Sequence, residues 1–94
     1  MIQYNFVWDK HKAQTNVIKH NVSFDEAKSV FYDKYAKSFY DKTHSILEDR
    51  FLFLGYSNKN RILLIVYCDI ENINTIRIIS ARKATKNEAK KYKR

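Results

Sequence analysis

The sequence predicts an α+β protein in which helices pack on one central antiparallel sheet. Two capped helical segments follow the first apolar run, strand-like segments fill the middle, and a third capped helical segment comes last. Segments in this order favour a layer of helices against a layer of strands. The expected order of elements is βααβββ(β)α, in a single domain over residues 1–94, because a chain of this length suits one core.

The first helix is expected over residues 10–20, after a short strand at YNFVW. Asp9 precedes it, and an aspartate in that position accepts hydrogen bonds from the free amides of the first turn. Asn21 is the expected stop, since asparagine tolerates the left-handed backbone that ends many helices. The apolar spacing predicts which residues face the core: Ala13, Val17 and Ile18.

A second helix is expected to begin at Ser23. Ser23 and Glu26 have the spacing of a capping box, in which each side chain bonds an otherwise free amide of the first turn. Val22 and Ala27 stand where a hydrophobic staple closes that turn. Asp33 marks the exit, and the core-facing side of this helix is predicted to carry Phe24, Ala27, Val30 and Phe31.

The middle of the chain is predicted to be β structure. AKSFYD is a short polar strand, expected at an edge of the sheet. The longer runs ILEDRFLFLGYS and RILLIVYC are apolar on both faces at their centres, as inner strands are. Residues 57–60, which read Ser-Asn-Lys-Asn, predict a hairpin turn between these two strands.

The last strand and the last helix follow a loop around Glu71 and Asn72. NTIRIISA is the strand, and the capping-box spacing of Thr85 and Glu88 starts the helix near Thr85. Two basic residues precede that helix, although a helix N-terminus carries partial positive charge. These residues are Arg82 and Lys83. They are expected either to pair with nearby carboxylates or to bind an anion together with the free amides of the helix.

The net charge is +8, and much of the excess lies near the C-terminal end. Residues 77–94 contain eight Lys or Arg and one acidic residue, Glu88. A basic end of this kind suits nucleic acid or an acidic protein partner. It suits equally well a solvated, lysine-rich tail that keeps a protein soluble.

Three features of the chain indicate a protein of the cytoplasm without membrane contact. The chain has no run of about 18 apolar residues, so no transmembrane helix is predicted. Its first ten residues, MIQYNFVWDK, lack the basic and apolar regions of a signal peptide. Cys68 is the only cysteine and sits in an apolar run, where a buried, unreactive thiol is expected.

Alternation along the strands predicts which charged residues share a face of the sheet. Glu48 and Arg50 are expected on one face of their strand. The last strand is expected to sort into two sets, Arg77 with Ile79, and Ile78 with Ser80 and Arg82.

An arginine cluster near Glu48 is the first candidate site, formed by Arg50, Arg61 and Arg77 on the face that helices leave uncovered. Guanidinium groups there would neutralise a phosphodiester and the charge that grows on it in the transition state. The alternative is ordinary cross-strand ion pairing of these arginines with Glu48 or Asp49, which sheets often contain.

The histidines and two aromatic residues are weaker candidates. The histidine spacing fits no metal site, so no metal and no cofactor is expected. At 3.6 residues per turn, His11 and His20 point about 180° apart and are not expected to share a site, whereas Lys12 and His20 lie about 80° apart. Trp8 is expected either to anchor the core or to stack on a base. Tyr92 is expected to stack on a base or to cover the last helix.

Taken together, these residues resemble the BrnT toxins of type II toxin–antitoxin systems. The resemblance runs from about Phe6 to Tyr92 and rests on FVWDKHKAQTNVIKHNVSFDEAKSVFYD, EDRFLFLGYS, RILLIVY and IRIISARKATKNEAKKY. One departure is Asn21, where many relatives have glycine. Asparagine accepts the left-handed conformation that glycine adopts there, so the turn should persist.

The resemblance implies a RelE-like fold and a ribonuclease that cleaves RNA to inhibit translation and growth. It also implies a BrnA-like antitoxin that neutralises the toxin and supplies the DNA-binding element, so that operator DNA is contacted only through the complex. A toxin dimer within a heterotetramer is an expected form of that complex. The alternative is a non-catalytic nucleic-acid-binding or co-repressor subunit of an antitoxin complex.

The mechanism that the resemblance supports is attack of a 2′-hydroxyl on the adjacent phosphate without a metal ion, giving a 2′,3′-cyclic phosphate. The candidates for phosphate and transition-state binding are Arg61, Arg77 and Arg82. The candidates for proton transfer are Lys12, His20 and Glu48. Further RNA contacts are expected from Trp8, Arg50, Lys83 and Tyr92.

Overall fold

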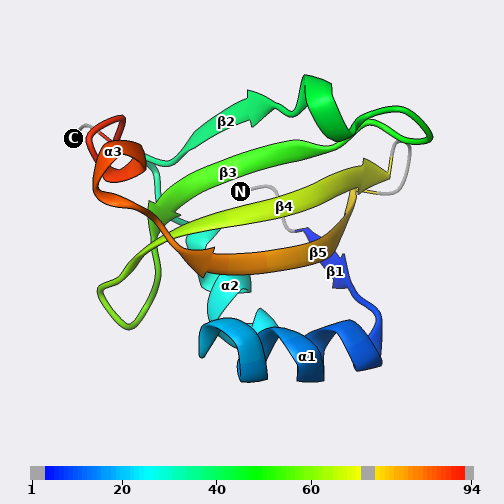
Figure 1. The fold of residues 1–94 in the computed structure, drawn as a ribbon, viewed down its shortest axis with the longest axis horizontal. Helices are drawn as coiled ribbons and strands as arrows, with labels where there is room; N and C mark the ends of the chain where they lie inside the picture. The colour runs from blue at the N-terminus through cyan, green and yellow to red at the C-terminus, as the bar shows by residue number, and fades with distance from the viewer. Residues whose placement is uncertain (1–3, 71–73, 93–94) are drawn as a thin grey trace.

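One five-stranded sheet, in the order β1-β5-β4-β3-β2, organises the computed structural model, which describes residues 4–70 and 74–92. In Figure 1, α2 lies behind the sheet, α1 runs along its lower edge beside β5, and α3 lies at one end. The α+β class and the order of elements are as expected, while the loop around Glu71 and Asn72 lies outside the described residues. The elements are β1 Asn5–Val7, α1 Lys10–His20, α2 Phe24–Val30, β2 Lys37–Tyr40, a 3₁₀ helix Lys42–His44, β3 Phe51–Tyr56, β4 Ile62–Ile70, β5 Thr75–Lys83 and α3 Lys86–Ala89.

The strand pairing is antiparallel except at one edge. β2, β3, β4 and β5 pair antiparallel in sequence order, with β2 at an edge as expected, and β1 pairs parallel to β5. Residues 57–60 form the turn between β3 and β4, where Asn60 has a positive φ of 59°. None of the helices in the described ranges is long and apolar enough to cross a membrane.

The predicted ends of α1 and the predicted start of α3 are confirmed, whereas α2 ends at Val30, before the expected exit at Asp33. The Asp9 carboxylate accepts a hydrogen bond from the backbone amide of Lys12 at 2.9 Å, and Asn21 ends α1 with φ 55° and ψ 37°. Thr85 and Glu88 form the full capping box at α3. Local side-chain chemistry therefore sets these helix ends without help from the rest of the fold.

Only one of the two hydrogen bonds of the capping box predicted at α2 is formed among the described contacts. The Ser23 hydroxyl accepts a hydrogen bond from the amide of Glu26 at 3.0 Å, as expected. The carboxylate of Glu26 does not complete the box in the described contacts; it bonds instead to Arg61 and Ser57. A tertiary partner has replaced the local one, and Glu26 is buried as a result.

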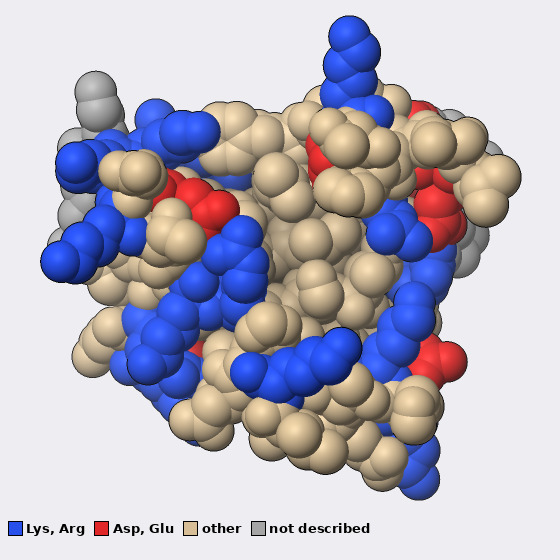
Figure 2. All heavy atoms as spheres, in the orientation of Figure 1, with Lys and Arg blue, Asp and Glu red and all other residues tan. Residues whose placement is uncertain are grey.

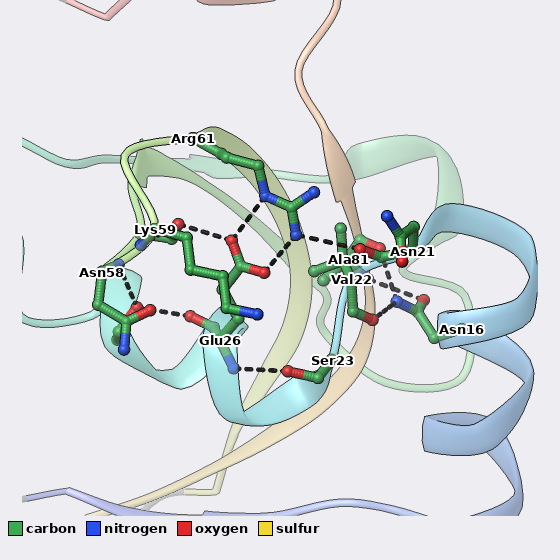
Figure 3. A network of polar contacts seen from close by, with 11 residues as sticks. Asn16, Asn21, Val22, Ser23, Glu26, Asn58, Lys59, Arg61 and Ala81 are labelled. Atoms are coloured by element: carbon green, nitrogen blue, oxygen red, sulfur yellow. Dashed lines mark hydrogen bonds and ion pairs between the residues drawn. The ribbon is translucent and has the colours of Figure 1, made fainter.

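The predicted core face of α1 is confirmed at Ala13, which packs against the core, and is wrong at Val17 and Ile18. Val17 and Ile18 are 44% and 85% exposed, while Asn16 is only 5% exposed. The Asn16 side-chain amide donates to the carbonyls of Ala81 at 2.7 Å and Val22 at 2.8 Å, and its oxygen accepts from the amide of Ala81 at 3.1 Å (Figure 3). The side chain thus bonds β5 as a neighbouring strand would, beyond the point where β1 ends.

The core lies between α2 and one face of the sheet. Phe24, Ala27 and Val30 of α2 are buried, as predicted, and Phe31 stacks on Phe53 of β3 with ring centroids 4.4 Å apart. The sheet residues that complete this cluster are Leu63, Ile65, Tyr67, Ile76, Ile78 and Ala81.

A β-bulge in β5 changes which of its side chains share a face. Tyr67 of β4 pairs with Ile78 and Val66 pairs with Ser80, which leaves Ile79 without a partner in β4. Buried positions therefore switch from even to odd numbers along β5, from Ile78 to Ala81. The predicted sorting is wrong because the extra residue shifts the alternation. Arg77, Ser80 and Arg82 now lie on one face, opposite α2.

β3 begins at Phe51, later than predicted. Glu48 and Arg50 therefore belong to the segment that connects the 3₁₀ helix to β3, not to a strand. Their side chains do not alternate between the two faces of the sheet, and their position depends on how this segment folds over the sheet.

Gly55 in β3 is expected to tolerate no side chain. A Cβ atom there would lie 2.8 Å from the Ala36 Cβ, 3.0 Å from Val30 Cγ1 and 3.1 Å from Asp33 Oδ2. Asp33 cannot easily move, since its carboxylate accepts from the amide of Tyr56 at 2.8 Å. We expect G55A to lower the free energy of unfolding by about 1–3 kcal/mol, measured by urea denaturation.

The double variant G55A/A36G is the matched control, because it removes the atom that makes the shortest contact. It is expected to recover part of the loss. Equal stability of G55A and the wild type would show that the strand shifts to make room.

Candidate functional site

The face of the sheet opposite α2, called the open face below, carries the two arginine side chains of β5, Arg77 and Arg82. Leu64, Val66 and Cys68 of β4 lie beside Arg82, Ser80 and Arg77 of β5. Figure 2, which looks onto this face, shows an uncharged, hollowed centre with Lys and Arg side chains around it and carboxylates against some of them. An uncharged floor with a basic rim suits a ligand that has both phosphates and flat rings.

The first hollow on this face has a volume of about 510 Å³ and is called the Arg77 hollow. The Arg77 guanidinium forms an ion pair with Glu48, and Arg50 lies 3.6 Å from the same carboxylate. The expected gathering of Arg50 and Arg77 near Glu48 is therefore found, together with the expected ion pairing. The full lining consists of Thr43, His44, Ile46, Leu47, Glu48, Arg50 and Arg77.

One carboxylate, that of Glu48, contacts both arginine side chains of the Arg77 hollow. The hydrogen bond from Arg77 lowers the pKa of Glu48, and the same contact raises the pKa of Arg77. The Arg50 Nε is buried and has no hydrogen-bond partner among the described residues. A buried donor without an acceptor is costly, and an anionic ligand would satisfy it.

His44 is a member of the hollow that the sequence did not indicate. His44 lies at the end of the 3₁₀ helix that follows β2, and its side chain is exposed. Its Nδ1 lies 3.0 Å from Oδ2 of Asp41. A carboxylate that bonds one ring nitrogen orients the imidazole and leaves the other nitrogen for proton transfer. The only available sequence signal was the spacing of Asp41 and His44, which is too common to single out a site.

A second hollow, of about 290 Å³, lies between α1 and β5 and is called the α1 hollow. Lys12 and His20 both line it, which agrees with the expectation that they flank a common edge. His11 lines it as well, so the expectation that His11 and His20 could not share a site is wrong. The hollow follows the helix, and side chains reach it from both flanks.

Arg61 does not join the other arginines. It lies on the covered side of the sheet, where its Nε donates to Glu26 Oε2 at 2.9 Å and its Nη2 donates to the carbonyl of Asn21 at 3.0 Å (Figure 3). The Ser57 hydroxyl also donates to Glu26, at 2.7 Å. These contacts lower the pKa of Glu26 and link the β3–β4 hairpin to the start of α2.

Of the two basic residues before α3, Arg82 pairs with a carboxylate of the chain, as one of the two expectations had it. Its guanidinium donates two hydrogen bonds to the Glu88 carboxylate, at 2.8 and 2.9 Å, so its charge is answered within the chain. Lys83 is exposed and follows Arg82 in the strand, so it points to the other side of the sheet. The two residues therefore do not form one site.

The Arg82–Glu88 pair makes stability depend on pH. Arg82 and the amide of Thr85 hold the pKa of Glu88 at about 2, below its ordinary value of 4.5. A carboxylate with a lowered folded-state pKa stabilises the fold above its unfolded-state pKa. This contribution is expected to disappear as the pH falls from about 4.5 towards about 2.

Urea denaturation of the wild type and of Glu88→Gln between pH 2 and pH 7 measures this contribution. The difference in unfolding free energy should be constant above pH 5 and should shrink below it. A difference that is the same at pH 2.5 and pH 6 would contradict the assignment to Glu88.

The two aromatic candidates have partners within the protein. Trp8 is half-buried and packs edge-on against Phe24, with ring centroids 5.8 Å apart. The Tyr92 hydroxyl donates to Asp33 at 2.6 Å, and its ring packs against Tyr56. Among the described residues, no three His, Cys, Asp or Glu side chains lie close enough to hold a metal ion.

Comparison with known proteins identifies the family of the chain. The family model described as "Ribonuclease toxin, BrnT, of type II toxin-antitoxin system" matches residues 8–88. The crystal structure of the Brucella abortus ribonuclease toxin BrnT has the same fold, with a TM-score of 0.67 and 24% identity over 89% of this chain and 100% of that one. No curated protein sequence matches significantly. The chain belongs to the BrnT family of ribonuclease toxins of type II toxin–antitoxin systems, a class that implies an antitoxin as partner.

Proposed function

We propose that this chain cleaves RNA in the Arg77 hollow by a reaction that needs no metal ion. One observation carries the proposal: two guanidinium groups, a carboxylate and an oriented imidazole line a single hollow on the open face. The residues are Arg50, Arg77, Glu48 and His44. Cationic groups and proton-transfer groups are the two requirements for displacement at a phosphodiester.

The reaction transfers the phosphoryl group within the RNA. The 2′-oxygen attacks the adjacent phosphorus while the Glu48 carboxylate takes the hydroxyl proton. The bond from phosphorus to the 5′-oxygen breaks, and His44 gives that oxygen a proton through the ring nitrogen that Asp41 does not hold. The products are a 2′,3′-cyclic phosphate and a 5′-hydroxyl. Arg77 and Arg50 stabilise the charge on the non-bridging oxygens.

Substrate binding and base activation are coupled through Arg77. In the free protein the guanidinium bonds Glu48, lowers the pKa of this carboxylate and so makes it a weak base. A phosphate that takes over the Arg77 donors releases Glu48, whose pKa then rises towards its ordinary value. The carboxylate becomes a better general base only when a phosphate is present.

The remaining candidates fall outside this hollow. We assign Arg61, Trp8 and Tyr92 to the architecture of the protein, because Glu26, Phe24 and Asp33 occupy their side chains. Arg82 lies on the open face beyond Ser80, where it would contact RNA only after leaving Glu88. Lys83 contributes through its charge.

We also propose the details of the partnership. A BrnA-like antitoxin neutralises the toxin by covering the open face, and it alone reads operator DNA, in a heterotetramer with two toxin chains. Ile46 and Leu47 support this, because they are 88% and 97% exposed at the rim of the Arg77 hollow. Light scattering of the co-expressed complex tests the stoichiometry, and a DNA shift assay with each protein alone tests which one binds.

The test of the cleavage mechanism is incubation of the purified chain with RNA in excess EDTA. We expect fragments with 5′-hydroxyl and 2′,3′-cyclic phosphate ends. Alkaline phosphatase should remove the terminal phosphate only after acid has opened the cyclic ring. Intact RNA together with tight binding would favour the non-catalytic subunit. Cleavage that stops in EDTA and returns with Mg²⁺ would overturn the metal-independent mechanism.

A further inference from the structure

We propose that the α1 hollow is a second phosphate-binding site, which holds the RNA strand at a nucleotide beyond the bond that is cleaved. The inference rests on the proposed cleavage at Arg77 and adds a requirement on the substrate: a single strand long enough to reach both hollows. The observations that carry it are the charge, the rigidity and the position of the α1 hollow.

The α1 hollow carries positive charge that nothing in its lining neutralises. Lys12, Lys19 and two histidines line it, and no carboxylate is among the described residues that do so. Within the described ranges neither lysine makes an ion pair, whereas Arg61, Arg77 and Arg82 each have a carboxylate partner. The nearby Asp9 carboxylate is turned to the first amides of α1. The hollow therefore presents ammonium groups, unpaired among the described residues, to an anionic ligand.

Helical spacing brings these side chains into one stripe. Residues 12, 16 and 19 are separated by four and three positions, which places them on the same side of a helix. The middle residue, Asn16, is buried and bonded to Ala81 and Val22. Because this amide fixes α1 against β5, Lys12 and Lys19 flank a rigid anchor.

The position of the α1 hollow relative to Arg77 suits one continuous strand. Ser80 of β5 lines the α1 hollow, and Arg77 lies three residues earlier on the same face, about 10 Å away at the rise of a β-strand. The bulge at Ile79 lies between them. Figure 2 shows basic side chains continuing from the open face to the lower rim, over α1. An RNA strand bound at Arg77 would therefore place a neighbouring phosphate near Lys12 and Lys19.

The test compares K12Q/K19Q with the wild type on RNA of two lengths. On a 12-nucleotide RNA we expect KM to rise about tenfold with kcat unchanged, because two charge-assisted contacts to phosphate are lost. On a dinucleotide, whose single phosphate is the one that is cleaved in the Arg77 hollow, KM and kcat should both stay at the wild-type values. A 2′-O-methyl 12-mer cannot be cleaved and reports binding alone. For this RNA, the slope of log K against log salt should be smaller in magnitude by about 1.4 in K12Q/K19Q than in the wild type.

The control K28Q/K34Q removes the same charge elsewhere. Lys28 lies on α2, with its ammonium over the Phe6 ring, and Lys34 follows that helix, with its ammonium over the Tyr35 ring. This variant should bind and cleave both RNAs as the wild type does. Thermal melting of both double variants confirms that they are folded.

Three results would overturn the second site. An unchanged KM and salt slope in K12Q/K19Q would exclude contact between these lysines and the strand. An equal loss on the dinucleotide and the 12-mer, or a fall in kcat, would place them at the cleaved phosphate. An equal effect of K28Q/K34Q would reduce the role of Lys12 and Lys19 to net charge. The binding measurement needs no cleavage, so failure of the proposed reaction is seen separately.

Discussion

Arg77→Ala is expected to slow RNA cleavage by about two to three orders of magnitude, as loss of one donor to transition-state charge does in other enzymes. Arg77 is held on the inner strand β5, opposite Cys68 of β4 and Val7 of β1, so its guanidinium is aimed into the hollow by two neighbouring strands. Single-turnover cleavage of a short RNA in EDTA measures the chemical step. Expression without antitoxin should then no longer arrest growth.

The fold is expected to survive this substitution. Arg77 and Glu48 are both more than one-third exposed, and ion pairs of this kind contribute little to stability because solvent screens them. Arg77→Lys keeps the charge but loses the planar pair of donors, so it should have intermediate activity. Lys28→Ala on the covered side should be fully active. Wild-type cleavage by a folded R77A protein would move the reaction out of the Arg77 hollow.

Sequence patterns predicted the helix ends well because the responsible contacts are local. Asp9, Ser23 and Thr85 each accept a hydrogen bond from an amide three residues later, and no distant residue is needed. Asn21 ends α1 in the left-handed conformation because few other side chains tolerate it. The same local logic failed for Glu26, where a guanidinium from the β3–β4 hairpin competes successfully for the carboxylate.

The face of β5 could not be predicted because alternation assumes regular pairing. One extra residue at Ile79 moves Arg82 to the side of Arg77, and nothing in IRIISARK marks that position. Arg61 illustrates a second limit. Its residue type fits a phosphate site, but its role depends on a partner, Glu26, that lies 35 positions earlier in the chain.

The candidate site was predicted in part for a physical reason. The types of Arg77 and Glu48 predict that they pair if they meet, because opposite charges attract. What brings them together is the segment before β3, which strand alternation does not describe. His44 escaped notice because its position follows from a short 3₁₀ helix, which a capping or periodicity argument does not indicate.

Asn16→Ala is expected to be the most destabilising substitution of an uncharged side chain in α1. It removes three hydrogen bonds and leaves the carbonyls of Val22 and Ala81 and the amide of Ala81 without partners. Each buried polar group left unpaired costs about 1–3 kcal/mol, and partial access of water limits the sum to about 3–5 kcal/mol. Urea denaturation monitored by Trp8 fluorescence measures the change.

Asn16→Asp and Thr15→Ala separate the reasons for this loss. An aspartate keeps the shape and can accept from the amide of Ala81, but it presents an oxygen where both carbonyls need a donor, so it should be nearly as unstable as N16A. The Thr15 hydroxyl bonds only the His11 carbonyl of its own helix among the described contacts, and T15A should be almost neutral. If N16A were as stable as T15A, packing rather than the amide would hold α1 against β5. Asn16 would then not be a rigid anchor between Lys12 and Lys19 at the second phosphate site.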